Sequence, residues 1–292
     1  MLKISEEVKQ RVIELDRRYR FTWDVRSIAH VIGIGHNSVA KIVREARGPR
    51  PKKTKRPHNG RTHINYRDVM WSSDFLAIPG GKLLKTLDEM SIYKLGWDIV
   101  DCESAEELVK HAEGIVESMG RAPLVWKFDN GGAFKSKVFQ DFLAEHKIIP
   151  YPIPPHAPWV NGRTERDNQE IENWLLILEG REISRAELRR EVDEGMLMLN
   201  YVKPRAVLGY RKSAEVYLNG AGVTEEMDRE RLALNLKDAK CQLGWNGWTE
   251  NRRIHRKAVR QVLLKWTLME EWEEVPEDAR IVNRSKQKNI SD

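Results

Sequence analysis

The chain has 292 residues, of which 40% are hydrophobic and 32% are charged, a balance typical of a globular protein with two or three domains. No apolar run approaches the roughly 20 residues that a membrane span requires, and the N-terminus is too polar for a signal peptide, so we expect no membrane partner. The two cysteines, Cys102 and Cys241, lie far apart and predict neither a disulfide framework nor a zinc site, which favours an intracellular location.

The net charge of +6 is unevenly distributed along the chain. Residues 1–62 contain 16 Lys and Arg against 6 Asp and Glu, whereas residues 63–220 contain 20 against 25 and residues 221–292 contain 14 against 13. A basic N-terminal part joined to an acidic middle part indicates a polyanion-binding module attached to a domain with a different task. A basic face that is merely solvated is the alternative.

The first 48 residues contain three segments with helical periodicity, which predict an all-α domain over 1–48. These segments are residues 5–19, 24–32 and 36–46, and Asp24 is a suitable N-cap for the second. Two short helices on either side of a glycine turn, here at Gly33, are typical of a helix-turn-helix.

In a helix-turn-helix the second helix of the pair enters the DNA major groove with its N-terminal residues facing the bases. The candidate DNA contacts are therefore the polar and basic residues of the third segment: His36, Asn37, Ser38, Lys41 and Arg44. A plain three-helix bundle without a DNA contact is the alternative.

Residues 49–62 are predicted to form a basic linker. The stretch from Arg47 to Thr62 has seven Lys or Arg, three prolines and no large apolar residue, so it cannot form a core. An extended basic arm can follow DNA phosphates or enter a minor groove, and a solubilising tether is the alternative. The residues expected to contact DNA here are Arg50, Lys52, Lys53, Lys55 and Arg56.

Residues 63–220 have an α/β pattern. The three segments VMWSSDFLAI, GKLLKTLDEM and YKLGWDIVD are short and apolar, as strands are. They precede a helix over 104–119, the strand PLVWKFD, a helix over 135–146, the strand KIIPYP, and helices over 163–179 and 184–200. This order predicts a mixed sheet with helices on its faces, as in a ribonuclease H-like fold.

Residues 221–292 predict a mostly helical C-terminal extension. Its helices are expected over 224–243, ending at Gly244, and over 249–274, with a flexible tail after Pro276. The first half of the second helix is basic, which fits either contact with DNA or another subunit, or a solvated helix packed on the core.

Three acidic residues lie where this architecture brings side chains together. Asp74 is inside the first strand of the 63–220 domain, Asp129 ends the strand PLVWKF, and Glu165 lies in the first turn of the following long helix. An acidic residue in an apolar strand is costly unless it is paired or holds a cation. Carboxylates at strand ends and at a helix start can converge on Mg²⁺.

The residues around these acids resemble a known family. Asp129 and Glu165 are separated by 35 residues, and the motifs FDNGGAF, PPHAPWVNGRTER, LDEMSIYKLGW and KPRAVLGYRKSAEVY are similar to those of the DDE-type superfamily, which contains the retroviral-type integrase core and bacterial insertion-sequence transposases. The resemblance covers roughly residues 66–217. Glu172 is a departure, because DNA-contacting lysine is common at that position, and we expect Arg163 or Arg166 to engage DNA instead.

The resemblance implies that Asp74, Asp129 and Glu165 are the catalytic residues and the ligands of two Mg²⁺ ions, which Mn²⁺ can replace. It implies a transposase or integrase that cleaves the 3′ ends of a mobile element and joins them to target DNA by two-metal phosphoryl transfer. Further DNA contacts are expected from the turn after Asp129, the Pro-rich loop and the start of the long helix: Asn130, His156, Trp159, Asn161, Arg163 and Arg166.

The implied partners are double-stranded DNA, at the element ends and the target, and further copies of the chain in a synaptic homo-oligomer; an ATPase helper is compatible with this scheme. The implied setting is the cytoplasm of a bacterium, with the protein encoded by the host or by a phage and associated with the nucleoid. Two alternatives remain open at this point: a DNA-binding regulator with a catalytically silent core, and a metal-dependent nuclease that cuts without joining.

Overall fold

The computed structural model describes residues 4–19, 22–47, 61–153, 162–223, 229–245 and 251–272. No helix within these ranges is long and apolar enough to cross a membrane.

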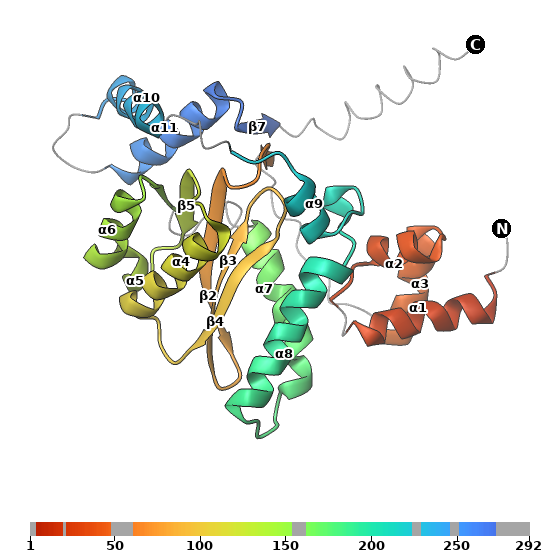
Figure 1. Cartoon of the computed structure of the whole chain (residues 1–292). Helices are drawn as coiled ribbons and strands as arrows, with labels where there is room; N and C mark the ends of the chain where they lie inside the picture. The colour runs from red at the N-terminus through yellow and green to blue at the C-terminus, as the bar shows by residue number, and fades with distance from the viewer. Residues whose placement is uncertain are drawn as a thin grey trace, which may run out of the picture.

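The N-terminal three-helix unit stands apart from the sheet, beyond the two helices that flank it (Figure 1). The carboxylate of Asp24 accepts hydrogen bonds from the backbone N–H groups of Arg26 and Ser27, as the N-cap prediction requires. The helix that starts there ends at Gly33, whose φ of 78° is a left-handed conformation that glycine adopts at little cost. The unit consists of α1 (Glu6–Arg18), α2 (Val25–Ile32) and α3 (His36–Arg47).

A five-stranded mixed sheet with the order β4-β3-β2-β5-β6 forms the centre of the molecule. β2, β3 and β4 form an antiparallel meander, and β5 and β6 extend the sheet in parallel from the other side of β2. A meander extended by two parallel strands, with helices on both faces, is the ribonuclease H-like fold that the sequence predicts. The strands are β2 (Met70–Ile78), β3 (Gly81–Asp88), β4 (Lys94–Val100), β5 (Val125–Phe128) and β6 (Ile149–Pro152).

Helices cover both faces of this sheet (Figure 1). One face is covered by α4 (Ala105–Met119), α5 (Gly132–Lys135) and α6 (Lys137–Glu145), and the other by α7 (Gly162–Leu175) and α8 (Arg185–Leu197). The prediction of one helix over 135–146 is wrong in its start, because the extended Ser136 (φ −60°, ψ 149°) separates α5 from α6. Its hydroxyl instead accepts a hydrogen bond from the N–H of Phe139 and caps α6.

Aromatic packing holds the α4–α6 layer on the sheet. Trp71 of β2 and Trp126 of β5 are completely buried and meet edge to face, with ring centroids 5.5 Å apart. The indole N–H of Trp126 donates to Ser73 Oγ at 2.8 Å, so the polar atom of this large apolar side chain is satisfied inside the core.

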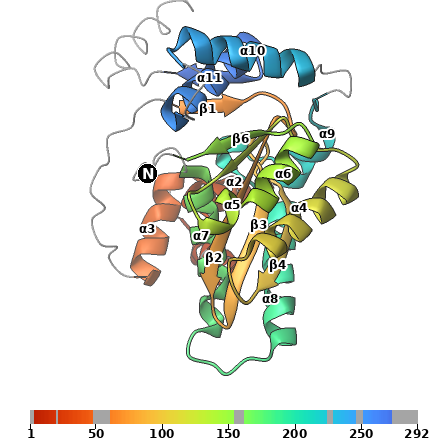
Figure 2. The same ribbon diagram turned by 90° about the vertical axis from the view of Figure 1, so that its left-hand side faces the viewer.

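The C-terminal extension crosses one end of the sheet, next to β6 and α6 (Figure 2). Two sequence predictions are wrong here. The basic linker does not extend to Thr62 and the last helix does not extend to 274, because residues 61–64 and 269–272 pair as an antiparallel two-stranded sheet. The extension contains α10 (Arg229–Gln242), α11 (Arg252–Lys265) and β7 (Met269–Trp272), and β7 pairs with β1 (Arg61–Ile64). Before it, α9 (Ser213–Asn219) is the last helix of the core.

β1 and β7 pair because a turn after α11 lets both strands bury apolar side chains. Thr267 has a left-handed φ of 54°, which ends the helical path after Trp266. The chain then reverses, and Met269 pairs with Ile64, both buried in the apolar cluster that α10 and α11 form with β5 and β6.

Candidate active site

Two of the three predicted acids lie side by side on β2 and just after β5, which are neighbouring parallel strands. The register pairs Ser72 with Lys127, so Asp74 and Asp129 each come two residues after a paired position. Asp74 is half-buried within β2, and Asp129 is exposed in the turn after β5, where its Oδ1 accepts a hydrogen bond from the N–H of Gly131. The sheet itself therefore brings these two carboxylates together.

The environment of Asp74 disfavours its charge. Burial raises the pKa of Asp74, the nearby charge of Asp129 raises it further, and Lys85 together with a hydrogen bond from Asn168 opposes the rise. The amide of Asn168 donates to Asp74 Oδ2 at 2.7 Å. Two close carboxylates, one of them partly desolvated, are a donor set that a divalent cation stabilises.

Glu165 lies in the first turn of α7 with its side chain exposed. Asn168 is three residues further along the same helix, so the face of α7 that carries Glu165 also contacts Asp74. Within the described parts of the chain, no three His, Cys, Asp or Glu side chains are close enough to hold a metal ion together. The structure thus brings Asp74 next to Asp129 and links Asp74 to the Glu165 helix, without gathering all three carboxylates.

Buried ion pairs fix the other side of α7 to the sheet. Asp167 Oδ2 lies 2.9 Å from Lys85 Nζ of β3, and Asp167 Oδ1 lies 2.5 Å from Lys94 Nζ of β4. Burial alone would raise the pKa of Asp167, but the two lysines hold it well below its usual range. Because Lys85 is also paired in register with Asp74, it joins the first acid to α7.

A second buried ion pair lies beside β2 and β5. Lys127 of β5 contacts Glu89 Oε1 at 2.8 Å, and Ser72 donates to the same oxygen. Burial would raise the pKa of Glu89, but Lys127 and Arg163 lower it. Ser72 and Lys127 are register partners, each two residues before a predicted metal ligand, so this contact joins the two strands that carry the aspartates.

The C-terminal extension also reaches the site. Arg252 Nη1 of α11 donates to Asn130 Oδ1 at 2.9 Å, and Asn130 Nδ2 donates to the Ile153 carbonyl at 2.6 Å. His255 of the same helix contacts the Pro150 carbonyl of β6 at 2.6 Å. Of the two predictions for the basic helix, the structure supports packing on the core, and this packing orders the turn that follows Asp129.

The predicted DNA contacts of the N-terminal unit lie on α3. Four are exposed and Ser38 is half-buried, and Lys41 has Glu45 at 4.0 Å as an ion-pair partner. The exposed four are His36, Asn37, Lys41 and Arg44.

The start of α7 is basic but partly engaged within the chain. Arg166 contacts Glu170 at 3.2 Å, and Arg163 lies 4.0 Å from Glu89. The remaining predicted contacts lie outside the described residues: Arg50, Lys52, Lys53, Lys55, Arg56, His156, Trp159 and Asn161.

Sequence reasoning missed the buried lysines and Arg252. Lys85 and Lys127 each sit inside an apolar strand, which is a signal that a buried partner exists, but the partner cannot be read from the strand. No local pattern connects Arg252 with Asn130, 122 positions earlier in the chain.

The comparisons with known proteins point to the same domain. The family model of the integrase core domain matches residues 66–158. Among solved structures, the catalytic core domain of BIV integrase has a TM-score of 0.44 at 16% identity, over 52% of this chain and 94% of that one. The HTLV-2 integrase catalytic core domain, solved in complex with magnesium, has a TM-score of 0.41 at 20% identity, over 53% and 97%.

A simian T-cell lymphotropic virus intasome, solved in complex with PP2A regulatory subunit B56 gamma, has a TM-score of 0.49 at 14% identity, over 74% of this chain and 79% of that one. No curated protein matches the sequence. The family match covers β2 to β6 together with Asp74 and Asp129. The chain therefore contains, over residues 66–158, a match to the integrase core domain.

Proposed function

We propose that this protein is a transposase or integrase that cleaves the 3′ ends of a mobile DNA element and joins them to target DNA. An integrase core domain supports the broader assignment as a polynucleotidyl transferase. The proposal rests on the placement of the acidic residues. Asp74 and Asp129 come together through the β2–β5 register, and Asn168 connects Asp74 to the helix of Glu165.

The donor chemistry of this edge fits Mg²⁺ or Mn²⁺. Hard divalent cations prefer carboxylate oxygens. The pKa of Asp74 is raised mainly by burial and further by the charge of Asp129, and a bound cation would favour its charged form. Asp74, Asp129 and Glu165 would hold two such ions. When bound, they supply Lewis-acid activation of the attacking oxygen and stabilise the leaving oxygen.

The chain's own residues orient the substrate and the ligands. Asn168 holds one oxygen of Asp74 and thereby fixes the direction of the other, while Arg252 and the Ile153 carbonyl fix Asn130 beside Asp129. The exposed side of α3 is the proposed reader of the element ends, and Arg163 the proposed phosphate contact next to Glu165. Alignment of this kind provides much of the rate in phosphoryl transfer.

The test is a strand-transfer assay with the DNA ends that flank the gene, a supercoiled target and Mg²⁺ or Mn²⁺. We expect joined products from the wild type and a loss of at least about 100-fold with Glu165→Gln, because the variant removes one carboxylate from the metal site. Glu194→Gln is the control, since Glu194 is an exposed acid on α8 outside the proposed site.

Two results would overturn the proposal. Binding of the DNA ends without cleavage in either metal, by wild type and variant alike, would indicate a regulator with a silent core. Cleavage that depends on Glu165 but never yields joined DNA would indicate a nuclease.

A further inference from the structure

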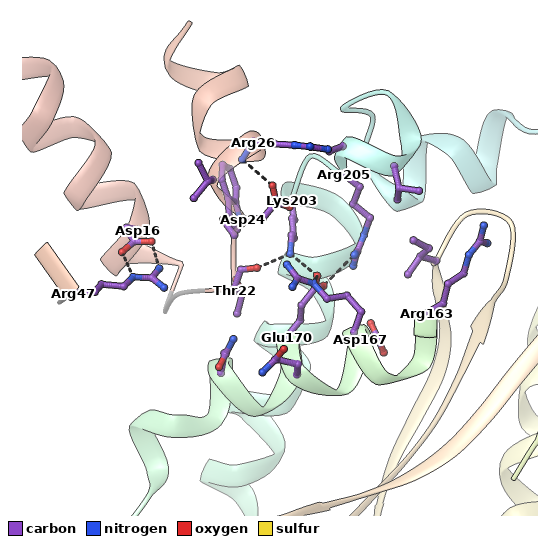
Figure 3. Close-up of a pocket in the computed structure, with 18 of the residues that line it drawn as sticks. Asp16, Thr22, Asp24, Arg26, Arg47, Arg163, Asp167, Glu170, Lys203 and Arg205 are labelled. Atoms are coloured by element: carbon purple, nitrogen blue, oxygen red, sulfur yellow. Dashed lines mark hydrogen bonds and ion pairs between the residues drawn. The ribbon is translucent and has the colours of Figure 1, made fainter. Parts of the chain in front are cut away.

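A cavity of about 1390 Å³ lies between the N-terminal three-helix unit and α7 (Figure 3). Its walls come from the end of α1, the start of α2, one side of α7 and the segment 203–207. This is a different side of α7 from the one that contacts Asp74, because Arg163, Arg166 and Glu170 line the cavity whereas Glu165 and Asn168 do not. We call it the interdomain cleft.

The cleft has an excess of positive charge. Seven of its lining residues are Lys or Arg and four are Asp or Glu. All four carboxylates have partners: Asp16 pairs with Arg47, Asp24 caps α2, Asp167 pairs with the two lysines of the sheet, and Glu170 has Lys203 at 2.7 Å and Arg205 at 3.0 Å. Three of the four acids are therefore paired with cations, and Asp24 is held by hydrogen bonds at the start of α2.

Several of the cations lack a close acidic partner or a hydrogen-bond acceptor. Arg17 and Arg26 have no ion-pair partner in the described parts of the chain, and Arg163 has only the distant Glu89. Arg205 is 5% exposed, yet its Nη2 has no hydrogen-bond acceptor among the described residues. A buried guanidinium N–H without an acceptor lacks the hydrogen bond that it makes in water, and a bound anion would supply one.

The two walls are held together by buried contacts, so the cleft exists before any ligand arrives. Lys203 Nζ contacts Glu170 of α7 and also donates to the Thr22 carbonyl of the N-terminal unit at 2.5 Å (Figure 3). Ser27 Oγ of α2 donates to the Pro204 carbonyl at 2.7 Å. A preformed site pays little ordering cost on binding.

We propose that the interdomain cleft binds the phosphodiester backbone of DNA and holds it between the N-terminal unit and the helix of Glu165. The inference rests on the proposed function for the identity of the polyanion. Arginine forks match phosphate oxygens in two-point hydrogen bonds, and the volume of the cleft exceeds that of pockets for small molecules, which are about 300–1,000 Å³. A strand seated there lies along the side of α7 that carries Arg163 and Arg166, next to the side that contacts Asp74.

The test is the salt dependence of DNA binding by the full chain, measured by fluorescence anisotropy with a labelled duplex of unrelated sequence. Each phosphate contact that is lost lowers the slope of log K against log salt by about 0.9. The double variant Arg17→Ala/Arg26→Ala should make the slope shallower by the amount expected for two lost phosphate contacts. The double variant Arg17→Lys/Arg26→Lys, which keeps both charges, should have the wild-type slope. Arg190→Ala, which removes an exposed arginine of α8 outside the cleft, should leave it unchanged.

An unchanged slope in the double alanine variant would overturn the proposal. So would stabilisation of the wild type by inorganic phosphate, absent in the double variant, if the DNA slope did not change, because the cleft would then be a site for a small anion. The assay needs no chemistry at the carboxylates. A wild type that binds DNA with the arginine-dependent slope but never joins it would therefore reject the proposed function and leave the cleft assignment standing.

Discussion

At the scale of single residues, Asn168 is the side chain that connects the predicted ligands. It lies three positions after Glu165 on α7 and donates to Asp74 Oδ2 at 2.7 Å. Its neutral amide counteracts the raised pKa of Asp74 without adding a charge that would compete with a cation. We therefore regard Asn168 as a positioning residue for Asp74.

We expect Asn168→Ala to lower the strand-transfer rate by about 10-fold, the equivalent of the roughly 1.4 kcal/mol that a hydrogen bond to a charged group contributes. The rate should recover in part at high Mn²⁺ concentration, because Asp74 remains present. The measurement is the initial rate across a metal titration, with Asn219→Ala, an exposed site at the end of α9, as the control. A variant with the wild-type rate at low metal would show that Asp74 needs no positioning.

At the scale of elements, α7 makes a different contact with the rest of the protein on each of three sides. One side contacts Asp74, and a second is joined to the sheet by the ion pair of Asp167. A third side carries Trp174, whose indole ring packs against α8. The packing with α8 is close because Gly195 faces Trp174: a Cβ at position 195 would lie 2.6 Å from Cδ1 of the ring.

Gly195→Ala should consequently lower the free energy of unfolding by about 1–3 kcal/mol, because overpacking displaces a rigid ring. Urea unfolding measures the change. Gly114→Ala on α4 is the matched control, since a Cβ added there would meet nothing within 4 Å and alanine favours helix, so it should be neutral or stabilising by up to about 1 kcal/mol. Equal effects of the two substitutions would contradict the packing argument.

The buried carboxylate of Glu170 makes the stability of this element depend on pH. Burial would raise its pKa, but Arg205 and Lys203 lower it from 4.5 to about 2. Since the folded-state pKa is the lower one, the stabilisation is complete above pH 4.5 and is lost as the pH falls towards 2.

Glu170→Gln should then destabilise the protein by on the order of 3 kcal/mol at neutral pH, and by progressively less as the pH falls from about 4.5 to 2. Urea unfolding at a series of pH values gives the difference between wild type and variant. A difference that stays constant over this range would show that the ion pairs of Glu170 contribute no net stability.

At the scale of the whole molecule, the N-terminal unit and the core share one apolar cluster. Trp23 and Ile28 of the unit belong to the same buried cluster as Ile171 and Trp174 of α7. Lys203 adds a polar contact at this interface, because it joins Glu170 to the Thr22 carbonyl. The position of the exposed face of α3 relative to α7 therefore depends on this interface (Figure 2).

Lys203→Met should loosen the N-terminal unit and not the sheet. Removing one partner of a buried ion pair costs on the order of 3 kcal/mol, a loss that falls on Glu170 of the core. The variant also removes the hydrogen bond from Lys203 to the Thr22 carbonyl, which is the contact between the two parts. We expect faster hydrogen exchange in α1–α3 with unchanged protection in β2 and β5, and wild-type behaviour from Lys212→Met, which alters an exposed lysine. Uniform loss of protection would mean that the two parts unfold together.

The sequence by itself determined the order of the elements and picked out Asp74 and Asp129, which the structure places close together. Period-two apolar strands, Asp24 as an N-cap and a glycine after α2 are local signals, and the observed helices and strands follow them closely. Asp74 inside an apolar strand and Asp129 at a strand end were recognisable because charge in such places requires a partner. The roles of Asp74, Asp129 and Glu165 as metal ligands stay predictions.

Only the tertiary structure decided which partners these residues have. The pairing of β1 with β7, the contact of Arg252 with Asn130 and the buried links of Lys85 and Lys203 join residues that lie far apart in the sequence. Local propensity carries no information about such contacts, because they gain their energy from apolar burial and charge neutralisation that arise only when separate elements pack. For the same reason, the interdomain cleft has no signature in any single segment.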